Sequence, residues 1–234
     1  MAVTLSPLIG SLLMALVAGQ PVPDALVRRL GEHAARVEKF SRETPTVVTI
    51  DGRELDGDGK LLHVTRTTSR VQWEGDKRRT TVLAATKDGK DSMKEAQSRA
   101  KDGDSQKRQF DSPFTEKVRA RYRFTVLEAE NADGLATLAF GPSGKKSTEL
   151  MEGTAVVHVE RGEVVSLKGR LSENPAFVDA METELEYRAE TPVGRALSKL
   201  RFEGKGGFLF YKRQGGATMT FEYEPAPASE APAR

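Results

Sequence analysis

Two stretches of the chain alternate between apolar and charged residues at every position. In residues 118–126 and 183–189, valine, leucine and aromatic side chains occupy one set of alternate positions, and arginine or glutamate occupies much of the other. Side chains in a β-strand point to opposite faces in turn, so this pattern predicts a sheet with one apolar and one charged face. We therefore predict a mainly β protein with some α, built on a large curved antiparallel sheet shaped as a half-barrel.

An amphipathic helix is predicted just before the first strand. Asp24 is its candidate N-cap, and apolar residues then recur at helical spacing among charged ones. These apolar residues are Leu26, Leu30, Ala34, Val37 and Phe40. A helix of about 18 residues with this stripe needs an apolar partner, and the apolar face of the sheet supplies one.

About ten to twelve short strands follow, separated by turn signals. The predicted strands are 46–50, 61–67, 69–74, 80–86, 118–128, 135–140, 154–160, 163–168, 183–189, 200–203, 208–212 and 219–223. The Asp-Gly pairs of 56–59 predict a hairpin turn, and the glycine-rich stretches 204–207 and 214–216 are also interpreted as turns. Short connections of this kind favour antiparallel neighbours.

Two segments interrupt the strands and are expected to pack as short helices or turns on the concave face. Residues 91–109 are highly charged, which indicates a solvated surface insertion or a lid over a cavity mouth. Residues 172–178 predict a short turn or helix that places Phe177 and Val178 where they plug the sheet.

The ends of the chain differ in composition from its middle. Residues 3–18 form an uncharged apolar run of signal-peptide length, and 1–19 are interpreted as a Sec-type leader cleaved after Gly19. The alternative is a buried N-terminal helix of a cytosolic protein. A leader implies a periplasmic or secreted protein with no stable membrane span after cleavage. Residues 20–224 then form one half-barrel domain, and 225–234 form a disordered Pro/Ala tail.

Composition argues against several classes of function. The net charge is +2, from 36 basic and 34 acidic residues, and only 6% of residues are aromatic, which disfavours nucleic-acid binding. With no cysteine, the chain has neither a thiolate metal site nor a cysteine nucleophile. The histidines are widely separated, and 56–60 fits a hairpin better than a calcium loop because Lys60 takes a ligand position. We expect no catalytic residues, no metal and no cofactor, and thus not an enzyme.

The apolar face of the predicted sheet is the candidate binding surface. One helix covers only a few strands of a sheet this wide, so the rest must be covered by barrel closure, by short helices or by a ligand. A ligand-holding cavity and a filled core both remain open. The predicted ligand-lining residues are Trp73, Tyr122, Phe124, Val126, Phe140, Val157, Leu185, Tyr187 and Phe221.

The order of these elements resembles the periplasmic lipoprotein-carrier fold (LolA/LolB-like), and the resemblance spans residues 22–223. Segments 57–60, 71–76 and 86–91 also look like relatives of that family. The resemblance implies a half-barrel whose concave apolar face, lidded by helices, holds acyl chains. It implies a lipid or an acylated lipoprotein as ligand and an envelope protein as partner. The membrane-anchored branch is excluded because the chain has no cysteine to acylate. The alternative is a cell-envelope structural or interaction module with a filled core and no ligand.

Overall fold

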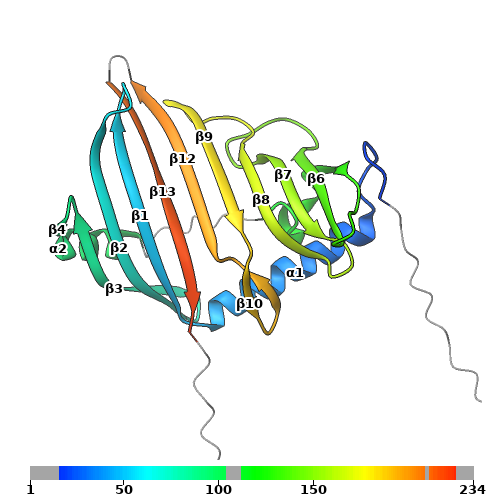
Figure 1. Cartoon of the computed structure of the whole chain (residues 1–234), viewed down its shortest axis with the longest axis horizontal. Coiled ribbons are helices and arrows are strands. Elements are labelled where there is room, and N and C mark those ends of the chain that lie inside the picture. The colour runs from blue at the N-terminus through cyan, green and yellow to red at the C-terminus, as the bar shows by residue number, and fades with distance from the viewer. Residues whose placement is uncertain (1–15, 104–111, 209–210, 225–234) are drawn as a thin grey trace, which may run out of the picture.

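An eleven-stranded antiparallel sheet forms the body of the molecule, and one long helix lies across one of its faces (Figure 1). The structure is a computed structural model and describes residues 16–103, 112–208 and 211–224. The helices are α1 (Asp24–Glu43), α2 (Met93–Gly103) and α3 (Glu116–Arg119). The strands are β1 (Thr46–Asp56), β2 (Leu61–Glu74), β3 (Lys77–Lys87), β4 (Lys90–Asp91), β5 (Tyr122–Glu128), β6 (Leu135–Pro142), β7 (Met151–His158), β8 (Glu163–Leu171), β9 (Val178–Glu186), β10 (Ala189–Thr191), β11 (Gly194–Ala196), β12 (Lys199–Phe208) and β13 (Tyr211–Tyr223). The predicted mainly β class, with a large antiparallel sheet, an N-terminal helix and short helices, is confirmed.

The sheet joins two meanders through its first and last long strands. Its order is β4-β3-β2-β1-β13-β12-β9-β8-β7-β6-β5, with a separate β10–β11 hairpin between β9 and β12. β1 and β13 pair along their length, with Val48 opposite Phe221. The centre of the sheet is therefore built from segments that are far apart in the sequence.

Some predicted elements differ from the structure. The 56–59 hairpin turn is confirmed: Oδ1 of Asp56 accepts hydrogen bonds from two backbone N–H groups of the turn, and Gly59 has a φ of +84°. Residues 204–207 and 214–216, however, lie within β12 and β13 rather than in turns. The strand predicted from Val118 begins only at Tyr122, because residues 116–119 form α3. Pro23, not Asp24, caps α1.

The two faces of the sheet carry different side chains. We call the face under α1 the covered face; from the strand registers its positions include Val48, Leu138, Leu167, Leu185, Leu200 and Phe221. The opposite, open face carries charged side chains paired across neighbouring strands, such as Arg201 with Glu184 at 3.5 Å and Lys168 with Glu182 at 3.9 Å. Exposed pairs of this kind contribute at most about 1 kcal/mol each, so stability depends mainly on the covered face.

The packed core lies between the first half of α1 and strands β5–β8. Leu30, Leu138 and Val157 are completely buried there. The Phe114 ring stacks on that of Phe124 with 5.1 Å between centroids. Gly31 lets the helix approach the loop at Phe114, since a Cβ at residue 31 would lie 2.6 Å from the Phe114 carbonyl oxygen.

The β5 edge of the sheet is covered by residues that precede α1. Gly19 donates its backbone N–H to the Val126 carbonyl, Val126 donates to that of Gln20, and Val22 donates to that of Phe124. Leu16, within the predicted leader, is buried in the core. Such pairing removes an open edge that would otherwise template aggregation. Residues 1–15 and the predicted tail from residue 225 lie outside the described part of the chain.

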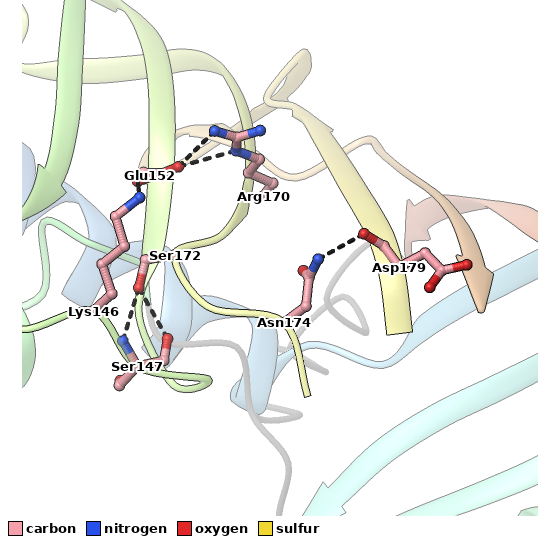
Figure 2. Close-up of polar contacts among 7 residues, drawn as sticks. All are labelled: Lys146, Ser147, Glu152, Arg170, Ser172, Asn174 and Asp179. Carbon is pink, nitrogen blue, oxygen red and sulfur yellow. Dashed lines mark hydrogen bonds and ion pairs between the residues drawn. The ribbon is translucent and has the colours of Figure 1, made fainter. Parts of the chain in front are cut away.

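A polar cluster ties together the loops at one end of β7, β8 and β9 (Figure 2). Glu152 accepts two hydrogen bonds from the Arg170 guanidinium and pairs with Lys146 at 3.0 Å. Lys146 and then Arg170 hold the pKa of the Glu152 carboxyl below its usual value. Ser172 and Ser147 exchange two hydrogen bonds. These groups satisfy one another, so the cluster anchors loops.

The burial of the core gives a test of the fold. Leu138→Ala should lower the free energy of unfolding by about 2–5 kcal/mol, because it opens a cavity at a fully buried site. The matched control is Leu127→Ala in the same hairpin, where the side chain is 47% exposed and a loss below about 1 kcal/mol is expected. Urea unfolding measures both, and equal losses would contradict this placement of the core.

Candidate ligand-binding cavity

A cavity of about 450 Å³ lies between the second half of α1 and the covered face of the sheet. Most of its wall is apolar; α1 forms one side, and residues of seven strands line the other. The apolar wall includes Ala34, Val37, Val48, Ile50, Val71, Trp73, Val164, Leu185, Leu200, Met219 and Phe221. Its volume falls within the range typical of small-molecule sites.

The cavity follows the helix across the strands. In Figure 1, α1 runs behind one end of the strands, from the β6 side toward β1, and it contacts both β8 and β2. His33 lines the cavity near β8 and β11, whereas Arg42 lines it near β2. The helical rise between these residues corresponds to about 14 Å. The cavity is thus elongated, with two chemically different ends.

The predicted lining residues divide into two groups. Trp73, Leu185, Tyr187 and Phe221 border the cavity. The remaining five belong to the packed core: Tyr122, Phe124, Val126, Phe140 and Val157. Both groups lie on the covered face. Side chains of α1 and of the loops pack against the core group, whereas the cavity separates the other group from α1.

The wall also contains residues that the sequence analysis did not single out as lining. Ala34 and Val37 come from the predicted apolar stripe of the helix, and that stripe was the signal that could have assigned them. Arg42 and Arg78 also line the cavity. No sequence pattern separates these two arginines from the others in the chain.

An aromatic and charged rim marks the β2–β3 end of the cavity. The Arg42 guanidinium lies 5.0 Å from the centroid of the Trp73 ring, a cation–π arrangement. Arg42 also pairs with Glu38 at 3.0 Å and approaches Asp76 at 3.9 Å. Arg78 lies directly opposite Trp73 on the neighbouring strand.

Two tyrosines stand in the cavity wall. The Tyr223 hydroxyl donates to the Leu197 carbonyl oxygen at 3.0 Å, and burial raises its pKa. Burial also raises the pKa of Tyr187 to about 12, and its hydroxyl makes no hydrogen bond to the described residues. Tyr187 therefore offers a neutral polar group to an occupant.

His33 lies at the inner end of the cavity, where it is 1% exposed. Desolvation lowers the pKa of this imidazole and Arg36 lowers it further, while Glu163 and a backbone hydrogen bond with Arg195 oppose the shift. Its Nε2 atom has no hydrogen-bond partner among the described residues. Gly194 has a φ of +99°, and a Cβ there would lie 2.4 Å from a Glu163 carboxylate oxygen and 3.3 Å from this nitrogen, so the position favours glycine.

A second hollow, of about 920 Å³, lies at the other end of the same strands and shares Ile50 with the cavity. Six of its lining residues are the glycines Gly52, Gly204, Gly206, Gly207, Gly215 and Gly216. These glycines permit close backbone approach: a Cβ at Gly206 would lie 2.2 Å from the Phe177 carbonyl oxygen. The Phe177 side chain, predicted to plug the sheet, is instead 63% exposed, with a φ of +67°.

The described residues contain neither a metal-binding cluster nor a membrane-spanning helix. No group of three or more histidine, aspartate or glutamate side chains there is placed to hold a metal ion. Within the same ranges, no helix has the length and apolar character needed to cross a membrane.

Comparison with known proteins finds a weak likeness in structure and none in sequence. No protein-family model matches the sequence, and no curated protein matches it. A DUF1329 family protein from Desulfovibrio piger is similar in structure, with a TM-score of 0.40, 11% identity and coverage of 86% of this chain and 95% of that chain. The Pseudomonas aeruginosa MucA/MucB complex contains a chain with a TM-score of 0.27, 11% identity and coverage of 86% and 99%. At these TM-scores the likeness carries no conclusion about function.

The burial of His33 predicts a pH-dependent stability. Burial lowers the pKa of His33 in the folded protein, so its imidazole stays neutral there. In the unfolded chain the imidazole has its ordinary pKa of 6.5, and it takes up a proton as pH falls below that value, which stabilises the unfolded state relative to the folded one. The free energy of unfolding should therefore fall as pH drops from about 7.5 through the unfolded pKa of 6.5. His33→Gln, which keeps a hydrogen-bond donor but does not titrate, should flatten this dependence. Urea unfolding across the range measures it, and parallel pH profiles for the two proteins would contradict the assignment.

Proposed function

We propose that this protein binds an acyl chain in the cavity between α1 and the covered face, without catalysing a reaction. The observation that carries this proposal is the elongated apolar cavity itself. An acyl chain is long, narrow and without polar groups, which matches a cavity of this shape and lining. The ligand is a lipid or the acyl group of a lipoprotein.

Apolar burial supplies the binding energy in this proposal. Transfer of apolar surface from water contributes roughly 25 cal/mol per Å². The cavity walls come from α1 and from strands of both meanders, so the wall is held by the fold. A cavity whose walls are formed in advance binds with a smaller loss of conformational entropy than a surface that must order itself around the ligand.

The uncharged apolar run of residues 3–18 supports export to the periplasm as the setting for this function. Envelope lipids and acylated proteins are available there. Export and the identity of the ligand are both part of the proposal.

Filling the cavity from the helix tests the proposal. Ala34 lines the cavity on α1, whereas the adjacent Ala35 is exposed. Ala34→Phe places a ring in the space that the acyl chain would occupy, and it should lower uptake of a long-chain fatty acid at least about tenfold. Native mass spectrometry of the purified protein, before and after addition of the fatty acid, measures uptake.

Ala35→Phe is the matched control, because it makes the same change one residue away on the solvent side of the helix. It should leave uptake as in the wild type. A wild-type protein that carries no lipid and takes up none would support the alternative, an envelope interaction module without a ligand. Equal uptake by both variants would place the ligand elsewhere.

A further inference from the structure

We infer that the rim formed by Trp73, Arg42 and Arg78 is a site for an anionic head group, so that the cavity takes a single-chain amphiphile ending in a carboxylate or a phosphate. This inference rests on the proposed function and adds the polarity and orientation of the ligand. The head lies at the β2–β3 end, and the chain runs along α1 toward His33.

Two arginines lie next to one aromatic residue at this end of the cavity. The Arg42 guanidinium lies over the Trp73 ring, 5.0 Å from its centroid. Arg78 is the direct cross-strand partner of Trp73, and such partners have Cβ atoms about 5 Å apart. Both arginines line the cavity. The cavity therefore has one arginine from the helix and one from the sheet beside Trp73.

Of the two rim arginines, Arg42 already pairs with carboxylates of the described residues and Arg78 does not. Glu38 pairs with Arg42 at 3.0 Å, and the exposed Asp76 is 3.9 Å from Arg42. Arg78 has no ion pair or hydrogen bond with the described part of the chain, and its side chain is exposed at the cavity mouth. An anion bound here would pair with Arg78 and lie beside Arg42, and guanidinium groups bind carboxylate and phosphate in a bidentate manner.

The opposite end of the cavity suits the tail of the ligand. Val164 and Leu185 form apolar wall there, and the ionisable groups that line it, His33 and Tyr187, are both uncharged at neutral pH. Desolvation keeps His33 neutral at neutral pH, and the nearby Arg36 and Glu163 have opposite charges. A charged head would lose its hydration at this end, where no arginine or lysine of the described residues lines the cavity.

The chain carries its own reporter of ligand orientation. Trp73 is the sole tryptophan, so the indole fluorescence of the protein comes from the rim. Bromine quenches indole fluorescence at short range. A fatty acid with bromine beside the carboxylate should quench Trp73 strongly, whereas one with bromine at the far end of the chain should quench it much less. Stronger quenching from the far end would overturn the proposed orientation.

Substitution of the free arginine tests the charge requirement. Arg78→Gln should weaken binding of a long-chain fatty acid about threefold to tenfold, since a charge-assisted contact at a partly exposed rim is lost. Binding of the fatty alcohol of equal length should change less than about twofold, because it has no charge to pair. The matched control is Arg79→Gln, which removes the adjacent arginine, paired with Glu74 at 2.7 Å. Arg79→Gln should bind both ligands as the wild type does.

The outcomes separate this inference from the proposed function. If neither the acid nor the alcohol binds to the wild type, acyl-chain binding itself is wrong. If both bind equally well and Arg78→Gln changes neither, acyl-chain binding stands and the head-group site is wrong. A long-chain alkyl phosphate and inorganic phosphate distinguish the sources of the anion: the alkyl phosphate should bind like the fatty acid, and inorganic phosphate alone should not compete at millimolar concentration. Competition by inorganic phosphate would show an anion site independent of the chain.

Discussion

The structure depends on one mismatch of size, between a wide apolar sheet face and the single long helix that covers it. Eleven antiparallel strands span roughly 50 Å across the sheet, whereas the 20 residues of α1 span about 30 Å. Where the helix lies close to β5–β8, side chains from both sides meet and the core is filled. Under its second half, the gap between helix and sheet remains as the cavity. Past the helix, the sheet face is lined by glycines and leaves the second hollow.

The same mismatch explains how one face holds both a rigid core and a binding site. Val164 of β8 and Leu185 of β9 belong both to the core and to the cavity wall, and Leu200 of β12 packs against the core and lines the cavity, so the register of the core also positions this part of the wall. The β1–β13 pairing brings the two meanders together beneath α1. A ligand would therefore contact segments from both ends of the domain, which makes the integrity of the whole sheet a condition for binding.

Charge is distributed in a way that keeps the apolar face available. Cross-strand ion pairs occupy the open face, where they keep the sheet soluble and disfavour register slips. At the cavity the ionisable groups are few, and they differ between the two ends. Arg42 and Arg78 lie at the mouth near β2 and β3, and the desolvated His33 lies at the inner end. The two ends of the cavity therefore differ in charge.

The alternation of apolar and charged residues was enough to predict the antiparallel sheet, its two faces and the helix that packs on one of them. The signal is local, because the strand and helix periods are visible in the spacing of apolar residues a few positions apart. It failed for the glycine-rich residues 204–207, which are predicted as a turn but lie within β12. At Gly206 the reason for glycine is a tertiary contact, because a Cβ there would clash with the Phe177 carbonyl oxygen. Likewise, Phe124 and Phe221 obey the same pattern on the same face, yet one is core and the other borders the cavity. Only the tertiary structure decided between them, because the position of α1 over the strands is set by packing between segments far apart in the chain, and no local pattern encodes that distance.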